Sequence, residues 1–340
     1  MKLAAKDFYI CPLSHEPLAL ELSEATEAGD VIGGTLAASS RKATYPIRDG
    51  IADFYLCHCE LPEDIQQNKL FYKKVAAEYD RGMDWLFQSF SVDEHHLRKK
   101  MVDLLELQPG ACVLEIGAGT CRDSKEILRR LDASGKFFIN DLSMNMLTVG
   151  RNRLQLDTID SGRLPLVELF TGDAASLPFP DRFFDAAYHF GGLNLFADKA
   201  KALQELSRVV KAGGKVVIGD ESVPPWLQNT TFGKILINSN SLYRYQAPLE
   251  CLPPNAQEVC VRWVLGEVFY VIDYRVAEGP PFLNLDLPIP GKRGGTHRTR
   301  YYGALDGINP ETKEKMEQVA CKEGVSLHEW LERTIKARLA

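Results

Sequence analysis

The sequence predicts an α/β fold built on a doubly wound, parallel sheet. Strand-like apolar runs alternate with helix-like segments, and the run over residues 113–116 ends in the closely spaced glycines Gly117 and Gly119. Glycine lets the chain turn sharply at the carboxyl end of a strand and lets a ligand approach the main chain. A glycine pair by itself is more often a plain turn, so the prediction depends on the segments that follow.

The following segments place further strands at regular intervals. The second expected strand ends at Asp141, a position from which a carboxylate can accept hydrogen bonds from both hydroxyls of a ribose. A helix is expected over residues 199–210, and Gly266 marks the turn of a terminal hairpin. The expected strands cover residues 113–116, 136–141, 167–170, 184–189, 215–219, 259–264 and 268–274.

Four sequence blocks follow one another in the order that is typical of a known family. The blocks are Glu115-x-Gly117-x-Gly119, Asp141-Leu142-Ser143, Gly172-Asp173-Ala174 with Leu177-Pro178-Phe179 behind it, and the segment 209–215. Together they resemble the class I S-adenosylmethionine-dependent methyltransferases, and within them the branch of the ubiquinone and menaquinone C-methyltransferases. The resemblance covers about residues 71–275 and implies a Rossmann-like, seven-stranded methyltransferase sheet with one antiparallel strand.

The resemblance also implies that the chain binds S-adenosylmethionine. Carried over to this sequence, Glu115 and the two glycines would line the methionine and ribose side, Asp141 would hold the ribose hydroxyls, and Asp173 would face the adenine amino group. Local roles stay open for the two aspartates, because Asp also caps helices and stabilises turns. The complete expected cofactor set is Glu115, Gly117, Ala118, Gly119, Asp141, Leu142, Asp173, Ala174, Tyr72 and Tyr79. The two tyrosines belong to a segment that would fold over the donor, although helical spacing alone favours a core position for them.

His189 and Tyr188 are the candidate catalytic residues, because they end the fourth expected strand and ligands of open α/β sheets lie at the carboxyl ends of strands. Methyl transfer from a sulfonium is an in-line displacement, so the enzyme chiefly aligns the acceptor with the methyl group. A base helps where the acceptor carries a proton to lose, and a histidine can take that proton at neutral pH. The alternative is a hydrogen-bonded structural histidine.

Composition limits the other function classes. The chain has 340 residues, 45% of them hydrophobic, and a formal net charge of −6. This charge argues against a general surface for nucleic acid or anionic membranes, because such surfaces depend on Lys and Arg. No apolar run approaches the roughly 18 residues that cross a bilayer, and the start lacks the apolar region of a signal peptide. The expected location is therefore cytoplasmic, which also fits eight scattered cysteines.

The order of these patterns predicts several segments. They are a degenerate zinc-ribbon-like cap at 1–60, a helical lid or linker at 61–107, the S-adenosylmethionine-binding core at 108–278 with an acceptor-pocket insertion near 222–256, a linker at 279–297 and a tail at 298–340. The small β-rich N-terminal domain resembles the zinc-ribbon activators of methyltransferases. Only Cys11 keeps its place in that pattern, where Ser14, Ala38 and Arg41 replace the other cysteines. Because Cys57-His58-Cys59 also lacks the spacing of paired zinc ligands, no metal is predicted.

The tail forms a helical C-terminal extension and resembles a ribbon-helix-helix unit of the Arc type. Residues 298–302 would form its strand, residues 310–323 its first helix, and Ser326 would cap its second helix. Two copies of such a unit interlock, which favours a homodimer. A plain helical tail is the alternative.

The function predicted from these features is methyl transfer to a small-molecule acceptor. Two alternatives stay open. One is an RNA or protein methyltransferase, which would fit the zinc-ribbon-like region. The other is a non-catalytic regulator that binds S-adenosylmethionine and reads DNA through its tail.

Overall fold

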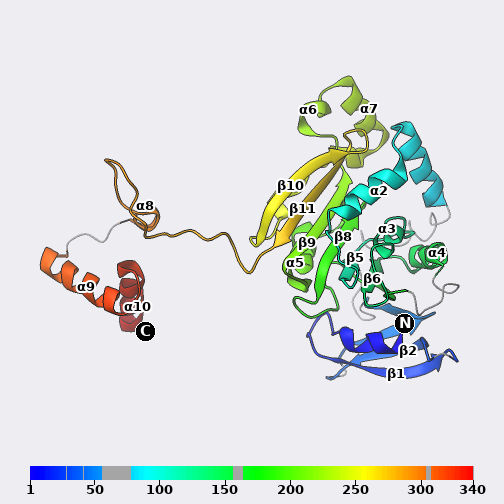
Figure 1. The fold of residues 1–340 in the computed structure, drawn as a ribbon, viewed down its shortest axis with the longest axis horizontal. Coiled ribbons are helices and arrows are strands. Elements are labelled where there is room, and N and C mark those ends of the chain that lie inside the picture. The colour runs from blue at the N-terminus through cyan, green and yellow to red at the C-terminus, as the bar shows by residue number, and fades with distance from the viewer. Residues whose placement is uncertain (28, 41, 56–77, 156–163, 304–307, 340) are drawn as a thin grey trace. The chain divides into compact units, whose positions relative to one another are not determined.

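A computed structural model of the chain describes all residues except 28, 41, 56–77, 156–163, 304–307 and 340 (Figure 1). The chain divides into two compact units, Met1–Pro280 and Pro281–Ala340. Over the described residues, no helix is both long enough and apolar enough to cross a membrane.

The first unit is built on a mixed sheet in which the described residues form eleven strands. They are β1 (Leu18–Ala25), β2 (Val31–Ala38), β3 (Thr44–Arg48), β4 (Ile51–Asp53), β5 (Cys112–Glu115), β6 (Lys136–Asp141), β7 (Leu166–Thr171), β8 (Phe184–Phe190), β9 (Val210–Glu221), β10 (Ala256–Val264) and β11 (Phe269–Val276). The spatial order is β1-β2-β3-β4-β7-β6-β5-β8-β9-β11-β10. Strands β7, β6, β5, β8 and β9 run parallel, whereas β11 is antiparallel to both β9 and β10.

The parallel part confirms the predicted Rossmann-like α/β class. Most strands lie within about two residues of the predicted ranges, but β9 begins at Val210 because its first residue already pairs with Phe184 of β8. The strand order reverses at β5, whose neighbours are β6 on one side and β8 on the other. In open α/β sheets such a reversal leaves a crevice at the carboxyl ends of the strands.

Two hydrophobic cores cover the two faces of the sheet. Successive residues of a strand point to opposite faces, and accordingly Phe137 and Phe138 of β6 belong to different cores. One core includes residues of α5 (Lys199–Val209), and the other includes residues of α2 (Glu94–Asp103), α3 (Ser124–Leu128) and α4 (Met144–Leu154). Helices on both faces make the sheet doubly wound.

Shorter elements complete the first unit. They are a helix over residues 78–89, α6 (Pro225–Gln228), α7 (Thr231–Ser239) and the 3-10 helices η1 (Leu3–Phe8), η2 (Leu193–Leu195), η3 (Ser241–Arg244) and η4 (Leu249–Cys251).

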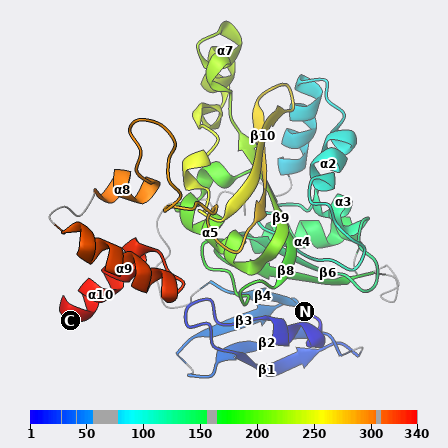
Figure 2. The ribbon, with the colours of Figure 1, turned by 60° about the vertical axis from the view of Figure 1, so that its left-hand side comes forward.

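The N-terminal strands β1 to β4 extend the same sheet beyond β7 (Figure 2). Ala52 and Asp53 of β4 pair with Phe170 and Thr171 of β7. The ring of Tyr9 lies 5.9 Å from that of Phe138, so this region shares a core with the sheet. A segment this small buries too little apolar surface to support a core of its own.

The second unit contains α8 (His297–Tyr302), α9 (Pro310–Lys322) and α10 (Leu327–Leu339). The prediction of a strand over residues 298–302 is wrong, because these residues belong to helix α8. A capping box explains the difference: the Thr296 side chain accepts a hydrogen bond from the Thr299 amide, and the Thr299 side chain accepts one from the Thr296 amide. The predicted cap at Ser326 is confirmed, since its hydroxyl accepts a hydrogen bond from the Glu329 amide at 3.2 Å.

Candidate functional site

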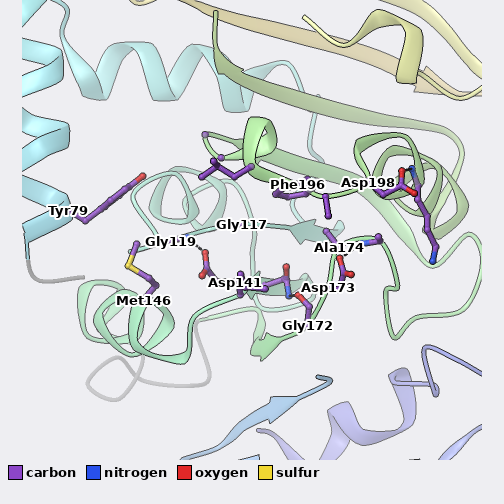
Figure 3. A pocket seen from close by; sticks show the side chains of 18 residues that line it. Tyr79, Gly117, Gly119, Asp141, Met146, Gly172, Asp173, Ala174, Phe196 and Asp198 are labelled. Carbon is purple, nitrogen blue, oxygen red and sulfur yellow. Dashed lines mark hydrogen bonds between the residues drawn. The ribbon is translucent and has the colours of Figure 1, made fainter. Parts of the chain in front are cut away.

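A cavity of about 270 Å³ lies at the carboxyl ends of β5, β6, β7 and β8 (Figure 3). This is the edge of the sheet at which the strand order reverses, where ligands of open α/β sheets bind. The lining residues are Tyr79, Gly117, Gly119, Asn140, Asp141, Leu142, Met146, Gly172, Asp173, Ala174, Ala175, Gly191, Gly192, Leu195, Phe196, Ala197, Asp198 and Lys201.

The turn after β5 brings its main chain to the cavity wall. Gly117 and Gly119 adopt φ angles of +60° and +55°, a region that side chains with a β-carbon rarely occupy. The amide of Gly119 donates a hydrogen bond to Asp141 Oδ2 at 2.7 Å. The amide of Ala118 donates to the carbonyl of Asn140 at 2.9 Å. The ends of β5 and β6 are therefore tied together beneath the cavity.

Asp141 is buried and held by two backbone amides. Oδ2 accepts from Gly119, and Oδ1 accepts from the amide of Ser143 at 2.8 Å. Burial raises the pKa of the Asp141 carboxyl to about 6, although these backbone hydrogen bonds oppose the rise. Each carboxylate oxygen keeps a further lone pair, so Asp141 can still accept hydrogen bonds from ligand hydroxyls in the cavity. Ser143, rather than Asp141, caps α4.

Asp173 has both a cavity position and a local structural contact. It lines the cavity, and its Oδ1 accepts a hydrogen bond from the Ala175 amide at 2.8 Å, which stabilises the turn after β7. It lies beside Gly172 and Ala174 in the turn after β7 (Figure 3). Asp173 therefore stabilises a turn, the local role that the sequence left open for it, and also lines the cavity.

The structure brings most of the expected cofactor residues to one cavity. Gly117, Gly119, Asp141, Leu142, Asp173, Ala174 and Tyr79 line it. Glu115 is buried beneath the turn, where burial raises its pKa well above the usual range. Ala118 is not among the lining residues, and Tyr72 lies outside the described residues.

The two candidate catalytic residues do not line the cavity. His189 is fully buried, and its Nδ1 forms a hydrogen bond with the carbonyl of Ile116 at 2.8 Å. Its ring lies directly behind the glycine turn, because a β-carbon on Gly117 would be 2.9 Å from His189 Cε1. Burial lowers the pKa of His189, which favours a neutral ring that donates from Nδ1. Tyr188 points to the opposite face and belongs to the core beneath α2 and α3.

The start of α5 supplies cavity residues that the sequence reasoning missed. Asp198 and Lys201 both line the cavity, and the Lys201 amide donates to Asp198 Oδ1 at 2.9 Å. An aspartate immediately before a periodic helix is a capping signal, and helix N-termini after sheet strands commonly face the ligand. That signal would have identified Asp198.

A buried carboxylate fixes the turn after β8. Asp220 Oδ1 accepts a hydrogen bond from the Gly192 amide at 3.0 Å, and Oδ2 accepts one from the Asn194 amide. Gly191 and Gly192 have φ angles of +88° and +96° and line the cavity. The carboxyl end of β9 therefore controls the shape of the wall that follows β8.

Cys11, the one cysteine that matched the zinc-ribbon pattern, is held by contacts within the N-terminal region. Cys11 is buried, and its Sγ lies 3.2 Å from the hydroxyl of Tyr45. Among the described residues there is no group of three or more His, Cys, Asp or Glu side chains that could hold a metal ion. The Cys57-His58-Cys59 cluster and Arg41 lie outside the described residues.

The chain is similar in sequence to named methyltransferases. A ubiquinone/menaquinone biosynthesis C-methyltransferase UbiE from Chromobacterium violaceum is 33% identical over 220 residues, which cover 61% of this chain and 86% of that protein. The enzyme of the same name from Hahella chejuensis is 36% identical over 154 residues, and the chain spans 59% of its length. A solved structure of Haemonchus contortus phosphoethanolamine N-methyltransferase 2 with S-adenosyl-L-methionine matches with a TM-score of 0.46 and 14% identity, covering 57% of this chain and 56% of that one.

Residues 63–246, more than half of the chain, match the model of the ubiE/COQ5 methyltransferase family. The resemblance to S-adenosylmethionine-dependent methyltransferases is thereby confirmed, and with it the cofactor. The chain belongs to the ubiE/COQ5 methyltransferase family, and S-adenosylmethionine is its methyl donor.

Proposed function

We propose that this protein transfers the methyl group of S-adenosylmethionine to a ring carbon of a small, quinol-type aromatic acceptor. The observation that carries the proposal is the cavity at the strand reversal, where the glycine turn, Asp141 and Asp173 converge from three different strands. The named activity of the relatives, C-methylation in ubiquinone and menaquinone biosynthesis, supports the choice of acceptor.

The residues of the cavity suit the donor. The glycine turn lets the methionine and ribose portion approach the main chain, and a side chain on Gly119 would extend toward the cavity residues Met146 and Tyr79. We assign Asp141 to the ribose hydroxyls, because both of its oxygens are fixed by backbone amides and the residue lines the cavity. We assign Asp173 to the adenine amino group, because it lines the cavity in the turn that follows β7, the strand next to β6 in the sheet.

Aromatic side chains lie near the turn after β8 and support an aromatic acceptor. Phe190, which precedes the cavity-lining Gly191, stacks on Phe269 with ring centroids 5.4 Å apart. Tyr243 contacts the same Phe269 edge-on at 6.3 Å. From residue 222 to residue 243 the chain carries only one charged residue, Lys234. Apart from the carboxylates Asp220 and Glu221 at the end of β9, this neighbourhood is aromatic and apolar, which favours a flat organic acceptor over a phosphate backbone.

The donor supplies an electrophilic methyl group when it is bound. In the transfer, the carbon–sulfur bond would break with its electron pair left on sulfur, the acceptor carbon would form the new carbon–carbon bond, and the ring proton would pass to solvent. The chain's contribution is to exclude water and align the acceptor with the methyl group. We infer that His189 supports the Gly117 turn rather than taking this proton, since it is buried behind the turn.

Calorimetric titration and a turnover assay test the proposal. The full chain should bind S-adenosylmethionine and not NADH, and with a demethylated quinol it should yield a product that is one methyl group heavier by mass spectrometry. Asp141→Ala serves as the control that abolishes binding. Donor binding without quinol methylation would overturn the acceptor assignment, and labelling of RNA or protein by radioactive donor would replace it with one of the alternatives.

We also infer that the protein forms a homodimer through its C-terminal unit. The support is a set of exposed large apolar side chains in that unit, namely Phe282, Leu283, Leu287, Tyr301, Tyr302, Val319, Ile335 and Leu339. All of these side chains lie within Pro281–Ala340, and contact with a second copy would remove their apolar surface from water. Sedimentation of the full chain should give twice the chain mass of 38.0 kDa, and a single chain mass would overturn the inference.

A further inference from the structure

Tyr79 forms one wall of the cavity from a segment far from the sheet strands. It lies in the helix over residues 78–89, and its side chain points toward the cavity across from Gly119 (Figure 3). A β-carbon on Gly119 would lie 3.9 Å from Tyr79 Cε1, so ring and glycine turn are close neighbours. The position of this ring therefore depends on what holds the helix against the turn.

The next residue, Asp80, provides that connection. Its Oδ1 accepts hydrogen bonds from Thr120 Oγ1 at 2.8 Å and from Arg122 Nη1 at 3.1 Å. Its Oδ2 pairs with Arg153 Nη2. One carboxylate thus joins the helix that carries Tyr79 to the glycine turn, to the segment before α3 and to α4.

The partners of Asp80 are fixed by contacts of their own. Arg153 Nε donates to the carbonyl of Thr120 at 2.8 Å. Arg122 forms a bidentate pair with Glu94 at the start of α2, at 2.7 and 2.6 Å. Side-chain exposure in this group is low, 27% for Asp80 and 13% for Arg122. Charge-assisted, bidentate contacts of this kind specify a geometry as well as contributing energy, unlike isolated pairs in full solvent.

We propose that Asp80 is a positioning residue for donor binding: through Thr120, Arg122 and Arg153 it holds Tyr79 as a fixed wall facing the glycine turn. The proposal rests on the proposed function, because Tyr79 is taken to contact the bound donor. Preorganised walls raise affinity because less side-chain and backbone freedom is lost when the ligand binds. Asp80 touches no ligand itself and acts through its neighbour.

A double-mutant cycle tests this role with S-adenosylhomocysteine as the calorimetric probe. Asp80→Asn keeps the side chain's size and removes its charge, and we expect it to weaken binding about tenfold. In a Tyr79→Ala background the same change should weaken binding less than about twofold, because the wall that Asp80 positions is gone. Equal effects in both backgrounds, or no effect in the wild-type background, would overturn the proposal.

Asp84→Asn is the matched control. Asp84 lies on the same helix, pairs with the same Arg122 and is 55% exposed, but it does not bridge to Thr120 or Arg153. It should leave the affinity within about twofold of wild type. A loss equal to that of Asp80→Asn would overturn the proposal, because it would assign the effect to general helix docking.

Hydrogen exchange of the ligand-free full chain separates this proposal from the proposed function. Asp80→Asn should speed amide exchange over residues 78–89, whereas Asp84→Asn should not. If the wild-type chain binds no S-adenosylhomocysteine, the proposed function fails. Unchanged exchange in Asp80→Asn would independently overturn the positioning role of Asp80. Faster exchange confined to Asp80→Asn would support it.

Discussion

The side chain of Cys121 fills the space that a β-carbon on Gly150 would need. A β-carbon there would lie 3.0 Å from Cys121 Cβ and closer still to its Sγ. Cys121 has a φ of +60° and lies in the turn after β5, two residues beyond Gly119. Gly150 lies on α4. Cys121 therefore fits in the turn only because residue 150 on the helix has no side chain.

We expect Gly150→Ala to destabilise the protein by about 1–3 kcal/mol, the usual cost of overpacking a filled core. In a Cys121→Gly background the same substitution should cost less than about 1 kcal/mol, because the space is free. Thermal and urea unfolding of the four variants measures this coupling. Costs that simply add would show that Gly150 and Cys121 are independent.

The affinity for S-adenosylhomocysteine should fall as the pH decreases below about 6, the raised pKa of Asp141. Protonation removes an acceptor from a carboxylate that we assign to the ribose hydroxyls. The same raised pKa means that this group stabilises the fold fully at acidic pH and that this contribution is lost as the pH rises through about 6. Calorimetry between pH 5 and pH 8 checks the binding part, with Asp141→Asn as a pH-independent control. A flat profile in the wild-type chain would contradict the assignment.

His189→Ala should destabilise the fold by about 2–4 kcal/mol, because it leaves a cavity behind Gly117 and removes the hydrogen bond to Ile116. Burial lowers the pKa of His189, so its contribution to stability is complete at neutral pH and is lost on acidification. Unfolding experiments should show this loss of stability in the variant. A large fall in kcat at unchanged stability and donor affinity would instead restore the general-base role predicted from the sequence.

Asp220→Asn should affect the acceptor more than the donor. The side-chain amide that replaces the carboxylate has only one oxygen, so it can no longer accept hydrogen bonds from both the Gly192 and the Asn194 backbone amides. The turn at Gly191 and Gly192 therefore loosens. We expect the KM for the acceptor to rise about fivefold to tenfold while the affinity for S-adenosylhomocysteine changes less than about twofold. Steady-state kinetics together with calorimetry separates the two. If the affinity for S-adenosylhomocysteine fell as much as the apparent affinity for the acceptor, Asp220 would instead act on the donor part of the cavity.

Cavity-lining residues were predictable wherever they follow directly from the end of a strand. Gly117, Gly119, Asp141 and Asp173 all sit at the carboxyl ends of successive parallel strands, and such ends meet at one edge of the sheet. The tail was less predictable. Residues 298–302 contain the strand-favouring types Thr and Tyr, but Thr296 and Thr299 cap the segment as a helix.

By itself, the sequence determined the α/β class, the strand series and the glycines and aspartates that line the cavity, because these depend on local patterns of apolar residues, glycines and terminal carboxylates. Only the tertiary structure decided that His189 lies behind the glycine turn and that the N-terminal strands continue the sheet. It also decided that Asp80 contacts Thr120, Arg122 and Arg153. Side-chain direction follows from strand register, and contacts between distant segments follow from packing. Neither is encoded in the spacing of neighbouring residues.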